Sequence, residues 1–227
     1  MRAIVIGSAG ELELREVPSP EPGPGHARVR IRACAVNRAD LLQRRGLYPA
    51  PADAPRDIPG LEIAGEVDAV GEGTADVRVG DRVYGIVSGG AYAEAVVVHG
   101  RTLAPIPVVD GRPLDFVSAA AIPEAFLTAY DAMVLQCGLA PGESVLVHAA
   151  GSGVGTAAAQ IARAIGARAI GTARSKEKLD RASAFGLADG IVTGASPDGS
   201  PRFAERAREL TGGRGVDVVL ELVGGAY

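Results

Sequence analysis

The sequence has few cysteines and no long apolar run, and each absence excludes a class of protein. Its 227 residues include two cysteines, Cys34 and Cys137, and no tryptophan. Two cysteines are too few for a disulfide scaffold or a cysteine-rich metal site. No apolar segment reaches the roughly 20 residues of a membrane-spanning helix, and no signal-peptide pattern begins the chain. We therefore expect a cytoplasmic protein without membrane insertion.

Negative charge slightly exceeds positive charge. Lys and Arg number 23 against 27 Asp and Glu, which gives a formal net charge of −4, and no basic tract is present. This balance argues against nucleic acid or an anionic membrane as the main partner. The hydrophobic content of 47% is enough for one large or two small cores. Small soluble molecules are therefore the expected ligands.

The first half of the chain alternates short apolar segments with Gly and Pro turns, which is typical of a β-rich domain. We expect strands at residues 3–6, 11–16, 27–35, 63–70, 82–87 and 92–98, with a short helix at 40–45. After Pro105 and Pro107 the pattern becomes helical, at residues 114–121 and 124–136. The expected domains are therefore 1–118 and 119–227.

From Ser144 onward, apolar strands and amphipathic helices alternate. The expected strands are 144–149, 168–173, 190–193 and 216–223, and the expected helices are 154–166, 175–186 and 201–211. This order predicts an α/β fold with a doubly wound parallel sheet. Four strands are only part of the sheet usual for dinucleotide-binding folds. We therefore expect a truncated sheet whose last strand forms an exposed edge.

Residues 144–155 read SVLVHAAGSGVG, an apolar strand that leads into a glycine-rich turn and then a helix. This is the local geometry of a dinucleotide phosphate site. The residues expected to bring backbone amides to a pyrophosphate are Ala150, Gly151, Ser152, Gly153, Val154 and Gly155. The strict G-x-G-x-x-G spacing is absent, because only Gly155 among its three positions is glycine. A plain strand-to-helix turn therefore stays open as an alternative.

The end of the next expected strand carries no acidic residue. An NAD site holds the ribose with an Asp or Glu about 20 residues after the glycine turn. Here Arg174, Ser175 and Lys178 follow that strand. A guanidinium, a hydroxyl and an ammonium group complement the additional phosphate of NADP. We predict NADPH as the cofactor, although a serine-capped helix with solvated charges fits the same residues.

Five sequence words extend over the whole chain: NRADLLQRRGLYP (37–49), GLEIAGEV (60–67), AAIPEAFLTAYDAM (120–133), VHAAGSGVGTAAAQIA (147–162) and VDVVLELVGG (216–225). In these words the sequence resembles the zinc-independent quinone oxidoreductases of the medium-chain dehydrogenase/reductase superfamily, and it is most similar to the p53-inducible branch. The resemblance implies a GroES-like β-domain and a Rossmann-like cofactor domain with the active site in the cleft between them. It also implies a homodimer for the full-length protein.

The resemblance also implies roles for single residues. Asn37 and Leu61 stand where zinc-dependent relatives carry metal ligands, so no metal is expected. Asn37 and Tyr48 are implied as hydrogen-bond donors at the acceptor site and Asp40 as an organiser of its loop. Alternative roles stay open: Asn37 and Asp40 could cap the helix, and Tyr48 could pack within its loop.

Thr128 and Gly224 are implied near the cofactor, with Gly225 beside the latter. A hydroxyl bonded to the carbonyl one turn back is the alternative for Thr128. The three histidines, His26, His99 and His148, are isolated in the sequence. They are expected to be solvated or to cap helices rather than to bind metal.

Hydride transfer from NADPH to a quinone or an activated alkene is the reaction that needs least help from a metal. The function expected is therefore a zinc-independent NADPH:quinone oxidoreductase. An enoyl or enone reductase with the same cofactor is the alternative among enzymes. An NADPH-binding protein without turnover, or an inactive fragment, is the alternative from another class.

Overall fold

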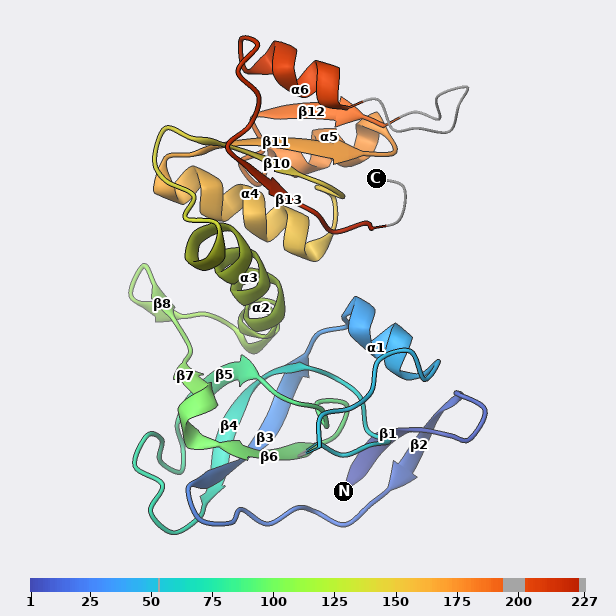
Figure 1. Ribbon diagram of the computed structural model, residues 1–227. Coiled ribbons are helices and arrows are strands. Elements are labelled where there is room, and N and C mark those ends of the chain that lie inside the picture. Colours follow the sequence, from blue (N-terminus) through green and yellow to red (C-terminus); the bar gives the residue numbers. More distant parts are fainter. Residues whose placement is uncertain (53, 194–202, 225–227) are drawn as a thin grey trace. The chain divides into compact units, whose positions relative to one another are not determined.

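The computed structural model describes residues 1–52, 54–193 and 203–224. The chain divides into two compact units, Met1–Glu124 (unit 1) and Ala125–Tyr227 (unit 2) (Figure 1). Within the described residues, no helix is both long and apolar enough to span a bilayer.

Unit 1 is built mainly from antiparallel strands. Its largest sheet has five strands in the order β6-β3-β4-β5-β7. These strands are β3 (His26–Cys34), β4 (Glu62–Val70), β5 (Arg82–Ile86), β6 (Ala95–His99) and β7 (Leu103–Pro105). Two further pairs join β1 (Arg2–Ile6) to β2 (Leu12–Glu16), and β8 (Val108–Val109) to β9 (Arg112–Pro113). The helices of this unit are α1 (Arg38–Gln43), the 3-10 helix η1 (Gly100–Thr102) and α2 (Phe116–Ala120).

One face of the five-stranded sheet carries the core of unit 1. Ala27 and Val29 of β3 and Ile63 and Val67 of β4 are buried together. Successive residues of a strand point to opposite faces, so these alternating positions place their side chains on one face. Glu62, the first residue of β4, is buried too, at 2% exposure. A carboxyl group is therefore enclosed at the beginning of this strand.

Unit 2 holds a parallel sheet of four strands in the order β12-β11-β10-β13 (Figure 1). The strands are β10 (Ser144–Val147), β11 (Arg168–Ala173), β12 (Asp189–Val192) and β13 (Val218–Leu220). The helices are α3 (Pro123–Tyr130), the π-helix η2 (Asp131–Gln136), α4 (Gly153–Ile165), α5 (Lys176–Ser183) and α6 (Ala204–Leu210). Helix α3 begins with the last two residues of unit 1.

Helices cover both faces of the parallel sheet. All four residues of β10 are buried, as expected for a central parallel strand. Val145 and Val147 pack with residues of α4 and α5, whereas Leu146 packs with Ala207 of α6. The predicted doubly wound, Rossmann-like sheet is confirmed. In the described part of the chain, β13 lies at the edge of this sheet.

Two expected elements differ in the structure. The helix expected at 124–136 is α3 followed by the π-helical turn η2, so its backbone spacing widens after Tyr130. The strand expected at 216–223 is shortened to Val218–Leu220. It ends because the Glu221 carboxylate accepts the backbone N–H groups of Val223 and Gly224 and so bends the chain into a turn. Of the helix expected at 201–211, the first two residues lie outside the described residues.

Candidate functional site

The first candidate site is at the carboxyl ends of β10 and β13 in unit 2. Strands β11 and β12 lie on one side of β10 and β13 lies on the other, so the strand order reverses between β10 and β13. Open α/β sheets bind their ligands at such a reversal, outside the carboxyl ends of the strands. The glycine-rich turn after β10 therefore occupies the position expected for a nucleotide site.

Hydrogen bonds hold the turn between β10 and α4 in one shape. The N–H of Ala150 donates to the carbonyl of Thr172 on β11 at 2.9 Å. Ser152 is the N-cap of α4, and its Oγ accepts the N–H of Gly155 at 3.0 Å. Ala149 has a φ of 50°, a left-handed conformation that residues other than glycine seldom adopt. The turn is thus fixed before any ligand arrives.

Two of the six predicted turn residues shape the turn from within. Gly155 is buried, and a Cβ there would lie 2.6 Å from the carbonyl oxygen of Ala149 and 2.7 Å from the Cα of Ala150. Only glycine fits at this approach of helix to turn. Ala150 is fully buried. Helix α4 therefore begins directly against the turn, as the dinucleotide motif requires.

The other four turn residues are more exposed to solvent. Gly151, Ser152 and Gly153 are exposed and Val154 is partly exposed. Among the described residues, the N–H groups of Gly153 and Val154 have no protein acceptor. Free amides at a helix start, together with the positive end of the helix dipole, favour an anion. The turn can therefore accept a phosphate group.

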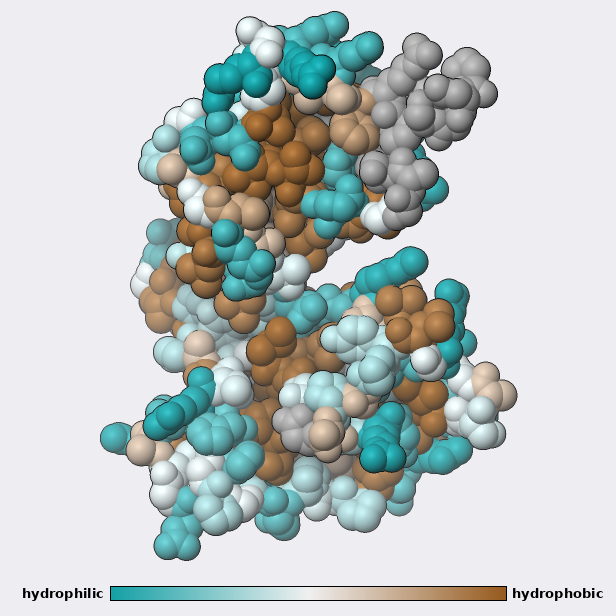
Figure 2. Space-filling view, viewed as in Figure 1, coloured by the Kyte–Doolittle hydropathy of each residue, from teal (hydrophilic) through white to brown (hydrophobic). Residues whose placement is uncertain are grey.

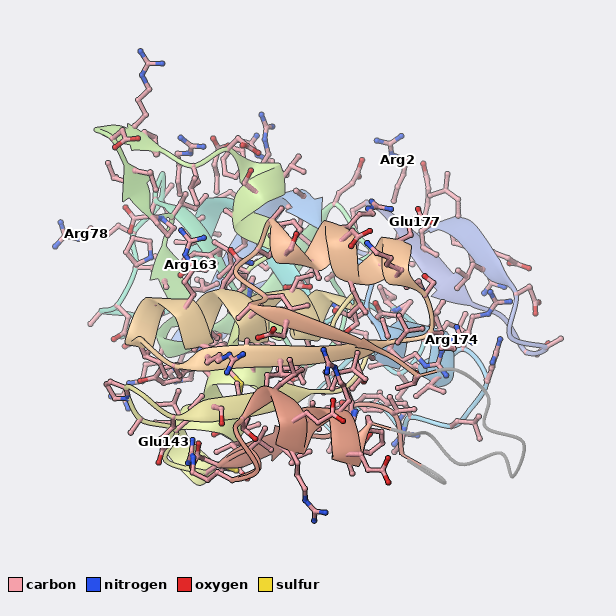
Figure 3. All side chains as sticks on the ribbon, turned by 90° about the horizontal axis from the view of Figure 1, so that it is seen from above. Arg2, Arg78, Glu143, Arg163, Arg174 and Glu177 are labelled. Carbon is pink, nitrogen blue, oxygen red and sulfur yellow. The ribbon has the colours of Figure 1, made fainter. Side chains whose placement is uncertain are left out.

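The three polar residues predicted to select NADP lie after β11. Arg174 and Lys178 are exposed and Ser175 is partly exposed; in Figure 3, Arg174 lies where β11 ends and α5 begins. Within the described residues neither Arg174 nor Lys178 forms an ion pair, whereas Lys176 pairs with Asp180 at 2.7 Å. The Ser175 hydroxyl does not cap α5, although Ser175 occupies the N-cap position.

Lys178 is the residue that connects these cations with the glycine turn. A Cβ added to Gly151 would lie 3.2 Å from the Cβ of Lys178. The start of α5 therefore packs beside the turn after β10, and the structure brings a lysine next to the proposed phosphate position. The capping alternative for Ser175 finds no support in its hydrogen bonds.

Thr128 and Gly224 lie on two further segments of unit 2. Thr128 is exposed on α3, one turn after Ala125, whose Cβ is 4.0 Å from the position of a Cβ on Gly153. Gly224 is exposed, has a φ of 71° and donates its N–H to Glu221 Oε1 at 2.9 Å. Gly225 lies outside the described residues. No hydrogen bond joins either residue to the glycine turn within the described part of unit 2.

His148 follows β10 directly and is 2% exposed, so the expectation of a solvated side chain is wrong for this residue. Its Nδ1 lies 2.9 Å from the Thr172 hydroxyl, and its N–H donates to the carbonyl of Leu220 at 3.0 Å. Burial lowers the pKa of its imidazole. His99 does cap a helix, since its Nδ1 accepts the N–H of Arg101 in η1.

The second candidate site surrounds the beginning of α1 in unit 1. Asp40 is 4% exposed. Its Oδ2 accepts the backbone N–H of Asn37 at 2.7 Å and the hydroxyl of Tyr92 at 2.9 Å. Asp40 therefore ties the start of its own helix to the segment before β6. This geometry agrees with an organising and capping position for Asp40.

Glu62 completes the network from β4. Its Oε1 accepts Nδ2 of Asn37 at 2.7 Å, and its Oε2 accepts the backbone N–H of Glu124 at 2.9 Å. Burial raises the pKa of the Glu62 carboxyl, and the two hydrogen bonds oppose that shift. Burial and the negative charge of Asp40 also raise the pKa of the Tyr92 hydroxyl. Asn37, Asp40, Glu62 and Tyr92 are called the carboxylate network below.

Sequence reasoning missed Glu62 and Tyr92 as members of this network. A signal for Glu62 exists, because it is a charged residue inside the otherwise apolar word GLEIA and such a residue is rarely buried without a partner. Tyr92 offers no comparable signal. Its hydroxyl meets Asp40 across 52 residues of chain, and no local pattern specifies that pairing.

Tyr48 does not join the carboxylate network. Its side chain is 39% exposed, and none of the described residues hydrogen-bonds to its hydroxyl. Val36, Leu41 and Leu47 expose apolar side chains along the same segment, and Figure 2 shows hydrophobic surface over α1. The structure thus brings Asn37 and Asp40 together and leaves Tyr48 on an exposed apolar loop.

No metal centre is evident in residues 1–52, 54–193 and 203–224, where no group of three or more His, Cys, Asp or Glu side chains could hold an ion. Independence from zinc stays a prediction.

Two protein families match consecutive parts of the chain. Residues 23–108 match the alcohol dehydrogenase GroES-like domain, and residues 153–227 match the zinc-binding dehydrogenase family. The match to the first family agrees with the β-rich unit 1, and the match to the second begins at the first residue of α4.

Curated relatives fall into two groups. Human quinone oxidoreductase is 33% identical over 229 residues, which cover 98% of this chain and 65% of that protein. Erythronolide synthase EryA2 of Saccharopolyspora erythraea is 43% identical over 194 residues, which cover 86% of this chain and 5% of the synthase. The chain therefore spans slightly less than two thirds of the quinone oxidoreductase and a small part of the synthase.

Two solved structures are similar to this chain over nearly its whole length. Mycobacterial Rv1454c, whose structure is complexed with NADPH, is 33% identical with a TM-score of 0.86 and is matched over 100% of this chain and 68% of its own. The CurK enoyl reductase is 30% identical with a TM-score of 0.84, over 99% of this chain and 68% of its own. From these matches and the two-part architecture, the chain belongs to the medium-chain dehydrogenase/reductase superfamily.

Proposed function

We propose that the chain is part of a zinc-independent, NADPH-dependent quinone oxidoreductase, of the type induced by p53. The observation that supports the cofactor most directly concerns two cations, Arg174 and Lys178, which form no ion pair with any described residue. They lie beside a turn whose free amides can accept phosphate. An NAD-specific site would carry a carboxylate at this strand end. The quinone as acceptor rests on the similarity to quinone oxidoreductases.

Each predicted cofactor residue has a place in this proposal. The amides of Gly151, Gly153 and Val154 would bind the pyrophosphate. The Ser152 N–H donates to the Ala149 carbonyl at 2.8 Å, so Ser152 would contribute its hydroxyl instead. Ala150 and Gly155 would shape the turn beneath the phosphates. Arg174, Ser175 and Lys178 would bind the phosphate on the ribose. Thr128 and Gly224 would lie closer to the nicotinamide. When bound, NADPH supplies the hydride, and these residues hold it in position.

The acceptor domain in this proposal is residues 1–118 and the cofactor domain residues 119–227. Asn37 and Tyr48 would donate hydrogen bonds to the acceptor oxygen on which negative charge develops, and Asp40 would keep the start of α1 in place. Asn37 is held by Glu62 and Asp40, so its amide is preorganised for such a bond. Full-length protein is expected to be a cytoplasmic homodimer.

An enoyl reductase is the second candidate, because the CurK enoyl reductase is 30% identical to this chain with a TM-score of 0.84, close to the 33% identity of human quinone oxidoreductase. Both reactions need the same hydride geometry and a donor for the developing oxyanion. The residues described in the two units fit a quinone and an unsaturated thioester equally.

NADPH oxidation should be measured with a benzoquinone and with a crotonyl thioester, before and after dialysis against a chelator. We expect turnover with the quinone that dialysis does not change. A large preference for the thioester would favour the enoyl reductase, and activity restored only by zinc would contradict independence from the metal. Micromolar NADPH binding with neither acceptor reduced would indicate a binding protein without turnover.

A further inference from the structure

Both carboxylate oxygens of Glu62 are engaged, and each has a different donor. Oε1 faces Nδ2 of Asn37 and Oε2 faces the backbone N–H of Glu124 in the first turn of α3. An ionised carboxylate can only accept hydrogen bonds, whereas a side-chain amide carries a donor on one atom and an acceptor on the other. The amide of Asn37 must therefore turn its nitrogen toward Glu62.

We propose that Glu62 is a positioning residue, which determines the orientation of the Asn37 amide that faces the acceptor. This inference rests on the proposed function in assigning Asn37 to the acceptor site. One hydrogen of Nδ2 is bound to Glu62, and among the described residues the second has no acceptor. Glu62 thereby leaves one N–H of Asn37 with a defined direction for the oxygen of the substrate.

The surroundings of Glu62 make this arrangement sensitive to its protonation. Asp40 on α1 and Glu124 on α3 are the acidic groups that face it, and Cys34 on β3 and Tyr92 are the other titratable neighbours. Burial raises the pKa of the Glu62 carboxyl and the charge of Asp40 adds to the rise. A protonated Glu62 could donate to the Asn37 oxygen instead, and the amide would then turn over.

Replacement of Glu62 by glutamine should change the orientation of the Asn37 amide while leaving the volume of the side chain at position 62 nearly unchanged. The glutamine can place only one oxygen, and the backbone N–H of Glu124 cannot rotate to suit it. The oxygen of the new side chain should therefore face Glu124, and its NH₂ group should face Asn37. Two donors would then meet unless the Asn37 amide turns over. Glu62→Gln should therefore turn the Asn37 amide over, so that its oxygen faces position 62.

The kinetic test compares Glu62→Gln with Glu66→Gln in the full-length enzyme. Glu66 lies on the same strand and pairs with Arg30 at 2.7 Å on the surface, so it controls for the loss of one charge from β4. We expect kcat with the quinone to fall about tenfold for Glu62→Gln, equivalent to one misplaced hydrogen bond, with KM for NADPH unchanged. If protonation of Glu62 turns the Asn37 amide over, kcat of the wild type should fall at acidic pH, and Glu62→Gln should show no such fall. Glu66→Gln should match wild type.

A double variant shows whether Glu62 acts through Asn37. In an Asn37→Ala background, Glu62→Gln should cause no further loss, because residues that act as one unit are non-additive. Independent, additive losses would overturn the proposal. So would a kcat within twofold of wild type for Glu62→Gln alone.

A test without catalysis keeps this inference separate from the proposed function. In NMR spectra of this chain, the side-chain NH₂ signals of Asn37 should titrate with Glu62 and should shift in Glu62→Gln but not in Glu66→Gln. If no acceptor is reduced while these signals behave as expected, the proposed function fails and the positioning of Asn37 stands. Signals that are equal in both variants and independent of acidic pH would overturn the inference whatever the activity.

Discussion

The two candidate sites differ in the solvent exposure of their polar side chains. In unit 1, Asp40 and Glu62 are 4% and 2% exposed, and side-chain bonds tie each of them to other segments. In unit 2, Arg174 and Lys178 are exposed, and the turn beside them is held mainly by backbone groups and by Ser152. One site is a buried network of side chains, and the other is a backbone turn held by hydrogen bonds with exposed cations beside it.

This difference suits the two tasks proposed for the sites. A phosphate is a large, exposed charge, so backbone amides and flexible cations can bind it without being buried themselves. An acceptor oxygen that becomes negative needs a donor whose direction is fixed beforehand. Burial raises the pKa of Glu62 and so disfavours its ionised form, yet the buried network provides that fixed direction for Asn37. The variants below test each side of the comparison.

The largest effect is expected at the backbone turn of unit 2. Gly155→Ala should reduce the free energy of unfolding by about 3 kcal/mol, because its Cβ would meet backbone atoms that cannot move aside. Gly153→Ala on the same helix is the matched control, since its Cβ would meet nothing closer than 4.0 Å. It should be neutral or stabilising by up to about 1 kcal/mol. Denaturant unfolding measures both, and equal effects would show that the turn is not rigid.

The same turn shows what the sequence could reveal. The order of apolar strand, glycine turn and helix is local, so β10, the turn and α4 could be predicted within one or two residues. Strand β11 likewise covers residues 168–173, the range that the apolar pattern predicts. By contrast, Tyr92 and Glu62 reach the start of α1 from distant segments. Their pairing depends on how β4 and the segment before β6 fold together, which no local pattern contains.

The next effect concerns the cations beside the turn. Neutralising both Arg174 and Lys178 to glutamine should weaken NADPH binding by about 1 to 3 kcal/mol, with little change for NADH, because only NADPH carries the additional phosphate. Arg181→Gln, in the last turn of α5, removes a similar exposed charge farther along the helix and should change neither affinity. Fluorescence titration of both nucleotides measures the difference. Equal losses for NADPH and NADH would contradict phosphate recognition by these residues.

A smaller effect is expected in the carboxylate network. Tyr92→Phe removes the hydroxyl that donates to Asp40 and should lower the free energy of unfolding by about 1.5 kcal/mol, as for a hydrogen bond to a charged group. Tyr84→Phe is the control in the same unit, because the Tyr84 hydroxyl has no hydrogen bond to the described residues. Urea unfolding compares the two. If Tyr92→Phe is as stable as Tyr84→Phe, the network contributes packing alone.

The smallest effect is a contrast in pH dependence between one carboxyl group of each unit. Burial raises the pKa of Glu62, whereas hydrogen bonds from Arg214 and from the N–H of Ser144 lower the pKa of Asp217 to about 2. Glu66 and Glu94 in unit 1 also have lowered pKa values, so the total pH dependence of a unit mixes both signs. Differences between wild type and single variants isolate each group.

The sign follows from which state binds more protons. Native Glu62 binds a proton more readily than unfolded Glu62, so its contribution to stability is greatest below the unfolded pKa and declines as pH rises through the higher native pKa. Asp217 behaves in the opposite way, because its contribution is present above its ordinary pKa and is lost as pH falls toward 2. The stability difference between wild type and Glu62→Gln should therefore decrease with pH, and that between wild type and Asp217→Asn should increase. Hydrogen exchange of amides in β4 and β10 from pH 3 to 7 measures both differences. Slopes of the same sign would mean that the hydrogen bonds to Glu62 lower its pKa by more than burial raises it. Glu62 would then depend on pH in the same direction as Asp217.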